Sequence, residues 1–150
     1  MRLKATAAIP ITLALLLGTV SAVAQGVSTA TEATAEFDNA LKSGPRASTY
    51  EDAMMCAGYW FALKDLHGIS KDVSFFQQLP SRLDEDTADK GHKYWGAVVA
   101  SHYDGDRAKL EAAGDRVGEY RKQMLQRFVD GLETGKIIGV FNTLGSCVPS

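Results

Sequence analysis

The stretch 48-STYEDAMMCAGYWFALKDLHG-68 decides the fold of this 150-residue chain. Ser48 and Glu51 match the S-x-x-E capping box, in which each side chain satisfies a free backbone N–H group at the start of a helix. The apolar residues that follow are too many for one narrow stripe, and Gly68 marks the end of the pattern. The sequence therefore predicts a helix over residues 50–67 that is central and covered on more than one side.

Other helical patterns lie on both sides of this segment, and glycine or proline residues separate them. We expect helices at residues 32–42, 70–79, 81–102 and 107–132, with a short apolar segment, helical or irregular, at residues 137–144. The longest helix carries apolar residues at steps of three and four, and Asp106 is its expected N-cap. The sequence has no alternating strand pattern of any length. The predicted fold class is therefore all-α, a helical bundle of four or five main helices.

The N-terminal residues are typical of a secretory signal. Arg2 and Lys4 precede an apolar run, and Ala22-Val23-Ala24 provides the small-x-small site that signal peptidase needs. No stretch approaches the roughly 20 apolar residues that a membrane span requires. We expect a signal peptide at residues 1–24, a flexible leader at residues 25–34 and a single helical domain at residues 35–150. The mature protein is then exported without a membrane span, to the periplasm of a bacterium or as a secreted protein.

Cys56 and Cys147 are the only cysteines of the chain. An even number of cysteines in an exported chain favours one disulfide over two free thiols. A bridge between them would tie the C-terminal tail to the central helix, and the tail would then be part of the fold.

The charged residues indicate neither a nucleic acid nor a metal as partner. The chain has 16 Lys+Arg and 18 Asp+Glu, and both signs are interspersed without a basic stripe for phosphates. Four carboxylates cluster at Asp84, Glu85, Asp86 and Asp89, but they lack the ligand spacing of an EF-hand loop. Their favourable interaction with the N-terminal end of a helix dipole explains them better.

One pattern occurs twice along the chain. Tyr59-Trp60-x-Ala62-x-x-x-x-His67 returns 35 residues later as Tyr94-Trp95-x-Ala97-x-x-x-x-His102. A separation of seven residues is two helical turns, so each tryptophan shares a helix face with its histidine.

This repeated pattern has two interpretations. In the first, each tryptophan anchors the core, and each histidine lies in the last turn of its helix, where the dipole favours a cation. In the second, His67 and His102, together with His92 or nearby carboxylates, line a cleft that binds a metal or haem. The candidate ligand-binding face consists of Tyr59, Trp60, His67, Tyr94, Trp95 and His102.

Catalysis is not indicated. The chain contains no G-x-S-x-G nucleophile elbow and no phosphate-binding glycine loop, and a disulfide would leave no free cysteine. We therefore expect an exported helical protein that acts as a protein-interaction or binding module, such as an inhibitor, an immunity-type protein, a stress chaperone or an accessory subunit. Its expected partner is another protein, and no cofactor is expected. The alternative is a metal- or haem-binding bundle that uses His67 and His102.

Overall fold

The computed structural model describes residues 21–70, 73–134, 137 and 139–149, and the regular elements within these ranges are all helical. The main helices are α1 (Ser21–Ser43), α2 (Tyr50–Ile69), α4 (Glu85–His102), α5 (Arg107–Thr134) and the short α6 (Val140–Ser146). A single turn of helix, α3 (Ser74–Gln77), and a 3-10 turn at Ser81–Leu83 connect α2 to α4. The predicted all-α bundle is confirmed.

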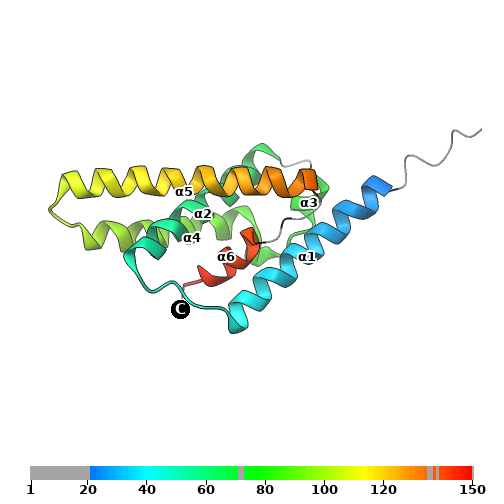
Figure 1. Cartoon of the computed structure of the whole chain (residues 1–150), viewed down its shortest axis with the longest axis horizontal. Helices are drawn as coiled ribbons and strands as arrows, with labels where there is room; N and C mark the ends of the chain where they lie inside the picture. Colours follow the sequence, from blue (N-terminus) through cyan, green and yellow to red (C-terminus); the bar gives the residue numbers. More distant parts are fainter. Residues whose placement is uncertain (1–20, 71–72, 135–136, 138, 150) are drawn as a thin grey trace, which may run out of the picture.

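Helix α2 lies at the centre of the bundle (Figure 1). It packs against α4, which runs antiparallel to it, and against α5, which runs parallel to it. Helix α6 lies between this group and α1, which crosses the other side of the molecule. In the described part of the chain, no helix is both long and apolar enough to cross a membrane.

The capping box of α2 lies one residue later than predicted. Thr49 is the N-cap: its hydroxyl accepts from the Asp52 backbone N–H (3.1 Å), and the Asp52 carboxylate accepts from the Thr49 N–H (2.9 Å). The backbone N–H of Ser48 also donates to Asp52, and these backbone bonds lower the pKa of that carboxyl. Glu51 points elsewhere, toward Arg116 of α5. The prediction of Ser48 and Glu51 was wrong because two overlapping boxes compete, and Thr49 with Asp52 forms the one that the structure adopts.

The central position predicted for this helix is confirmed. Half of its residues are buried, and they lie on all sides of the helix: Ala53, Met54, Cys56, Ala57, Gly58, Tyr59, Trp60, Ala62, Leu63 and Leu66. The helix runs past Gly68 to Ile69, and Ser70, which we expected to cap the next helix, closes α2 instead.

The expected leader is helical in the structure. Helix α1 begins at Ser21, eleven residues before the predicted start at residue 32, and the side chains of Ala30 and Ala33 are buried in the core. Two residues of the segment expected to form a flexible leader, Ala30 and Ala33, thus contribute to the core. Small side chains allow a close approach to neighbouring helices, and alanine also favours helix. Residues 1–20 of the predicted signal peptide lie outside the described residues.

The segment between α2 and α4 is less helical than predicted. In place of the helix expected at residues 70–79, the structure has the single turn α3. The helix expected from residue 81 starts as a 3-10 turn, and α4 begins only at Glu85. Asp84 is its N-cap, because the Asp84 carboxylate accepts from the Thr87 backbone N–H (2.8 Å). The helix predicted from residue 81 therefore begins after its own cap at Asp84, and residues 81–83 form the 3-10 turn.

The turn between α4 and α5 follows the prediction. Gly105 has a φ of 79°, which is a left-handed conformation that suits glycine, and Asp106 accepts from the Lys109 backbone N–H at the start of α5. Helix α5 then continues two residues past the predicted end, to Thr134.

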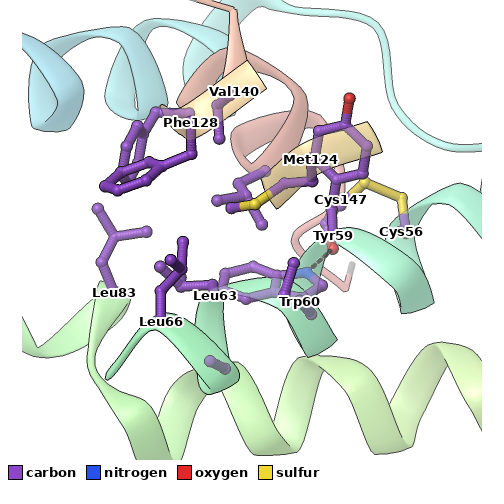
Figure 2. Packing of buried hydrophobic residues seen from close by; sticks show 14 of the residues in the cluster. Cys56, Tyr59, Trp60, Leu63, Leu66, Leu83, Met124, Phe128, Val140 and Cys147 are labelled. Carbon is purple, nitrogen blue, oxygen red and sulfur yellow. Dashed lines mark hydrogen bonds between the residues drawn. A yellow bond between two sulfur atoms is a disulfide. The ribbon is translucent and has the colours of Figure 1, made fainter. Parts of the chain in front are cut away.

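The buried side chains form one hydrophobic core, and α6 is part of it (Figure 2). The largest of them come from four helices and the 3-10 turn: Phe37, Tyr59, Trp60, Leu63, Leu83, Met124, Phe128, Val140, Phe141 and Leu144. Because α6 supplies three of these side chains, the C-terminal segment is part of the core and not a loose tail.

Candidate binding site

Both tryptophans of the chain donate to the same backbone oxygen. The indole Nε1 of Trp60 lies 3.0 Å from the Cys147 carbonyl oxygen, and that of Trp95 lies 2.7 Å from it. Figure 2 shows the first of these bonds, deep in the core. A carbonyl oxygen has two lone pairs, so the two indoles satisfy it fully. Helices α2 and α4 thus hold the end of the chain through a common acceptor.

The predicted disulfide joins the same residue to α2. Cys56 and Cys147 are bonded, their Cα atoms lie 5.3 Å apart, and both side chains are fully buried. Cys56 precedes Trp60 by one helical turn, so the two side chains leave α2 on the same face. One face of α2 therefore makes both a covalent and a hydrogen-bonded contact to Cys147.

The antiparallel pairing of α2 and α4 explains why the repeated pattern converges at its tryptophans. Trp60 and Trp95 are near the middle of their helices, and both indoles therefore reach the Cys147 carbonyl oxygen. Gly91 of α4 lies against the Trp60 indole, so closely that a Cβ atom there would come within 2.6 Å of the ring. Because Gly91 has no side chain, the Trp60 indole can pack directly against α4.

The same pairing separates the two histidines. His67 ends α2, and its Nε2 lies 2.7 Å from the Leu83 carbonyl oxygen just before α4 begins. His102 ends α4 and stacks on Tyr50 at the start of α2. A helix of 18 residues is about 27 Å long. His67 and His102 thus lie at opposite ends of the pair and cannot both ligate one haem or one metal ion.

The contacts of His92 differ from those of His67 and His102. Its Nδ1 lies 3.1 Å from the Ala57 carbonyl oxygen, and its ring stacks on Phe61. In the described part of the chain, no three His, Cys, Asp or Glu side chains are placed to hold a metal ion. The histidines of the alternative hypothesis are therefore dispersed over the α2–α4 pair.

The two tyrosines of the pattern also differ in their surroundings. Tyr59 is buried, and its hydroxyl oxygen accepts from Arg127 of α5 (2.8 Å). Tyr94 is 44% exposed and lies at the mouth of a hollow beside Trp60. Of the predicted face, the structure therefore brings Trp60, Trp95 and Tyr94 together, and it places Tyr59 and the histidines elsewhere.

This hollow, which we call the Trp60 pocket, has a volume of about 390 Å³. It lies between α1, α4 and the residues that follow α6. Its lining residues are Phe37, Leu41, Trp60, Arg82, Thr87, Lys90, Gly91, Tyr94, Val148 and Pro149. Apolar and aromatic groups form most of its wall, and the charged side chains come from Arg82 and Lys90.

The two cations of the wall have different partners. Arg82 makes a two-bonded ion pair with Asp38 of α1, at 2.9 and 2.6 Å. Lys90 makes no ion pair with any residue that the structure describes, whereas Lys64 and Lys93 share Asp89. These two lysines lower the pKa of Asp89 to about 2, with the hydrogen bond from Lys64 as the largest cause. Asp89 is thus occupied, and Lys90 is left without a fixed counterion.

A second polar cluster fastens α2 to α5 on the surface. The Tyr120 hydroxyl and the Arg116 guanidinium both donate to Glu51. The hydrogen bond from Tyr120, followed by that from Arg116, lowers the pKa of Glu51, while partial burial raises the pKa of Tyr120. Glu51 is held in its charged form, as expected of a structural ion pair and not of a general acid.

Most of the pocket residues were not predicted as site residues. Phe37 and Leu41 were placed only within the helix predicted at residues 32–42, and Thr87, Lys90 and Val148 carried no signal in the sequence. These residues come from separate segments of the chain. They lie together because the residues around Cys147 are held by Trp60 and Trp95. Comparison of the chain with protein-family models, with curated proteins and with solved structures found no match.

Proposed function

We propose that this chain is an exported helical binding module and that the Trp60 pocket is its binding site. The observation that carries the proposal is a hollow of about 390 Å³ with an apolar wall beside the hydrophobic core. Sites for small ligands are typically concave, mostly apolar and about 300–1,000 Å³ in volume, with a few polar groups at the edge. The Trp60 pocket has these features.

The walls of the pocket are held in place before any ligand arrives. Trp60 is fixed by its bond to the Cys147 carbonyl, and Val148 follows directly after the disulfide cysteine. Phe37 packs edge-on against Trp60 from α1. A preorganised site loses less conformational entropy when a ligand binds.

The side chains of the pocket favour binding over catalysis. Its lining among the described residues contains no histidine, cysteine or carboxylate. General acid–base or nucleophilic chemistry needs such groups next to the reacting atoms. The pocket provides apolar contact, two hydroxyl groups and two cations, which are groups that select and orient a ligand.

Export is part of the proposal. A buried disulfide suits an oxidising compartment, and the N-terminal pattern is that of a secretory signal. We expect the protein isolated from the exported fraction to begin at Gln25, which its intact mass would show. A mass that still includes residues 1–24 would contradict this part of the proposal.

The binding function can be tested by filling the pocket. A set of small aromatic compounds should shift the backbone amide resonances of Gly91 and Tyr94 in two-dimensional NMR spectra of the ¹⁵N-labelled protein. Val148→Trp should abolish these shifts, because the larger side chain occupies the hollow. Val129→Trp adds the same ring at a half-exposed position of α5 and should leave them unchanged.

Two results would contradict the proposal. The first is that no compound shifts the pocket resonances. The second is that shifts persist unchanged in Val148→Trp while that variant keeps the spectrum of a folded protein.

A further inference from the structure

We infer that the ligand of the Trp60 pocket is a small carboxylate with an apolar body, and that Lys90 binds its carboxylate group. This inference rests on the proposed function and names the ligand class of the same site. Lys90 is exposed at the edge of the pocket, and the apolar wall lies beyond it.

Charge complementarity supports an anion at this edge. Of the two cations that line the pocket, Arg82 is already neutralised by its two bonds to Asp38. The charge of Lys90 contributes to the lowered pKa of Asp84, but the Asp84 carboxylate caps α4 through the Thr87 N–H and makes no ion pair with Lys90. Within the described part of the chain, Lys90 is therefore a cation beside an apolar hollow that makes no ion pair.

The single positive charge of Lys90 suits a carboxylate better than a phosphate. One lysine matches one negative charge. A phosphate with two charges and three terminal oxygens is usually bound by several donors, among them arginine forks or a group of backbone N–H groups. Thr87 and Tyr94 supply the other polar groups of this wall, and both are neutral.

The surroundings of the pocket favour a small molecule over a protein partner. Tyr94 is the one strongly exposed large apolar residue among its described lining residues. A stable protein interface has a wide apolar centre inside its polar rim and buries about 800 Å² on each partner. Here charged side chains stand at the edge, and the apolar surface lies inside a hollow of limited volume.

The test compares two ligands that differ only in charge. 4-Phenylbutyrate and its neutral amide, 4-phenylbutanamide, are titrated into the ¹⁵N-labelled protein, and the Gly91 amide reports binding while Gly105, in the α4–α5 turn, serves as the internal control. We expect the carboxylate to bind about five- to tenfold more tightly than the amide, as a charge-assisted hydrogen bond allows. Lys90→Gln should remove this preference, and Lys122→Gln, an exposed lysine of α5, should preserve it.

The outcomes separate the two proposals. Equal binding of both compounds at Gly91 would overturn the assignment of the ligand class and leave the binding function intact. A carboxylate preference that survives Lys90→Gln would overturn the role of Lys90. If neither compound shifts Gly91, the ligand class is wrong, and the broader compound set then decides whether the binding function is wrong as well.

Discussion

Helices α2 and α4 carry the same Tyr-Trp-x-Ala-x4-His spacing, but each residue of the pattern is more buried in α2. Tyr59 and Trp60 are both 1% exposed, whereas Tyr94 is 44% and Trp95 9% exposed. Ala62 and Ala97, and also His67 and His102, differ in the same direction. Helix α2 has α4, α5 and α6 around it, whereas α4 packs mainly on α2. A repeated pattern thus sets which side chains share a face, and the number of neighbouring helices sets how deeply they are buried.

The largest expected effect comes from removing the two tryptophans in turn. Trp60→Ala should lower the free energy of unfolding by about 3–5 kcal/mol, since it removes a fully buried ring and leaves a cavity. Trp95→Ala should cost at least about 1 kcal/mol less, because its ring lies at the edge of the core. Urea denaturation of both variants would measure the difference. Equal losses would show that burial does not distinguish the two helices.

Phenylalanine variants serve as controls for the shared carbonyl. Trp60→Phe or Trp95→Phe alone leaves one indole bonded to Cys147, whereas the double variant leaves a buried acceptor without a donor. The double loss should therefore exceed the sum of the single losses by about 1 kcal/mol or more.

The disulfide should have the next largest effect. Replacing both Cys56 and Cys147 by alanine should cost about 2–4 kcal/mol, because the bridge restricts the unfolded chain over a long loop. The fold should persist, since the indoles of Trp60 and Trp95 still hold the tail. Denaturation would measure the loss of stability. Amide hydrogen exchange would show that the fold persists, and the exchange rates should increase most in α6. A loss below about 0.5 kcal/mol would mean that the indoles alone hold the tail.

Two glycines of α4 allow a sharper test of the contact between the helices. Gly91→Ala should destabilise the protein by about 1–3 kcal/mol, because the new methyl group would push against the Trp60 ring. Gly96→Ala, in the same helix but with open space at the Cβ position, should stabilise it by up to about 1 kcal/mol. Thermal unfolding of both variants would measure the contrast. If Gly91→Ala were also stabilising, the close contact between Trp60 and α4 would be wrong.

The tyrosine hydroxyls should differ by a smaller amount. Tyr59→Phe removes the acceptor of Arg127 from a buried ring, in a partly buried hydrogen bond, and should cost about 1 kcal/mol. Tyr94→Phe should change stability by less than about 0.5 kcal/mol, because the ring of Tyr94 is largely exposed. Chemical denaturation of the pair would test whether the second tyrosine is energetically neutral.

The smallest effect concerns the carboxylates that cap the two helices. The pKa values of Asp52 and Asp84 are lowered chiefly by backbone hydrogen bonds, from Ser48 and Thr49 for the first and from Thr87 for the second. A lowered pKa in the folded state means that the stabilisation is present at neutral pH and is lost as the pH falls below about 4. Asp52→Asn and Asp84→Asn should each cost less than about 1 kcal/mol at pH 7, after allowance for solvent screening.

Asp52→Asn should have the larger of these two effects, because Asp52 accepts more bonds than Asp84. The difference between each variant and the parent chain should shrink between pH 5 and pH 3. Urea denaturation at these pH values would measure it, and a difference that grows on acidification would contradict the assigned direction of the pKa shifts.

Local patterns predicted the helices where one signal stood alone. Asp106 and the turn at Gly105 were predicted correctly, because an N-cap next to a flexible glycine has few alternatives. The start of α2 at Tyr50 was predicted correctly, but its capping residues were misplaced because two capping boxes overlap there. The start of α4 was misplaced because Pro80 is followed by two residues, Ser81 and Asp84, that can each begin a helix. The choice between such alternatives depends on packing, which local signals do not contain.

By itself, the sequence determined the all-helical class, the central position of α2 and the pairing of Cys56 with Cys147, because hydrophobic spacing and a count of two cysteines leave few alternatives. Only the tertiary structure decided what the repeated pattern does. The antiparallel pairing of α2 with α4 keeps equivalent mid-helix residues close and places equivalent end residues far apart, so Trp60 and Trp95 share the Cys147 carbonyl oxygen while His67 and His102 lie at opposite ends of the pair. The Trp60 pocket has the same origin, since Phe37, Lys90 and Val148 become neighbours only when the disulfide and both indoles bring the end of the chain against α2 and α4.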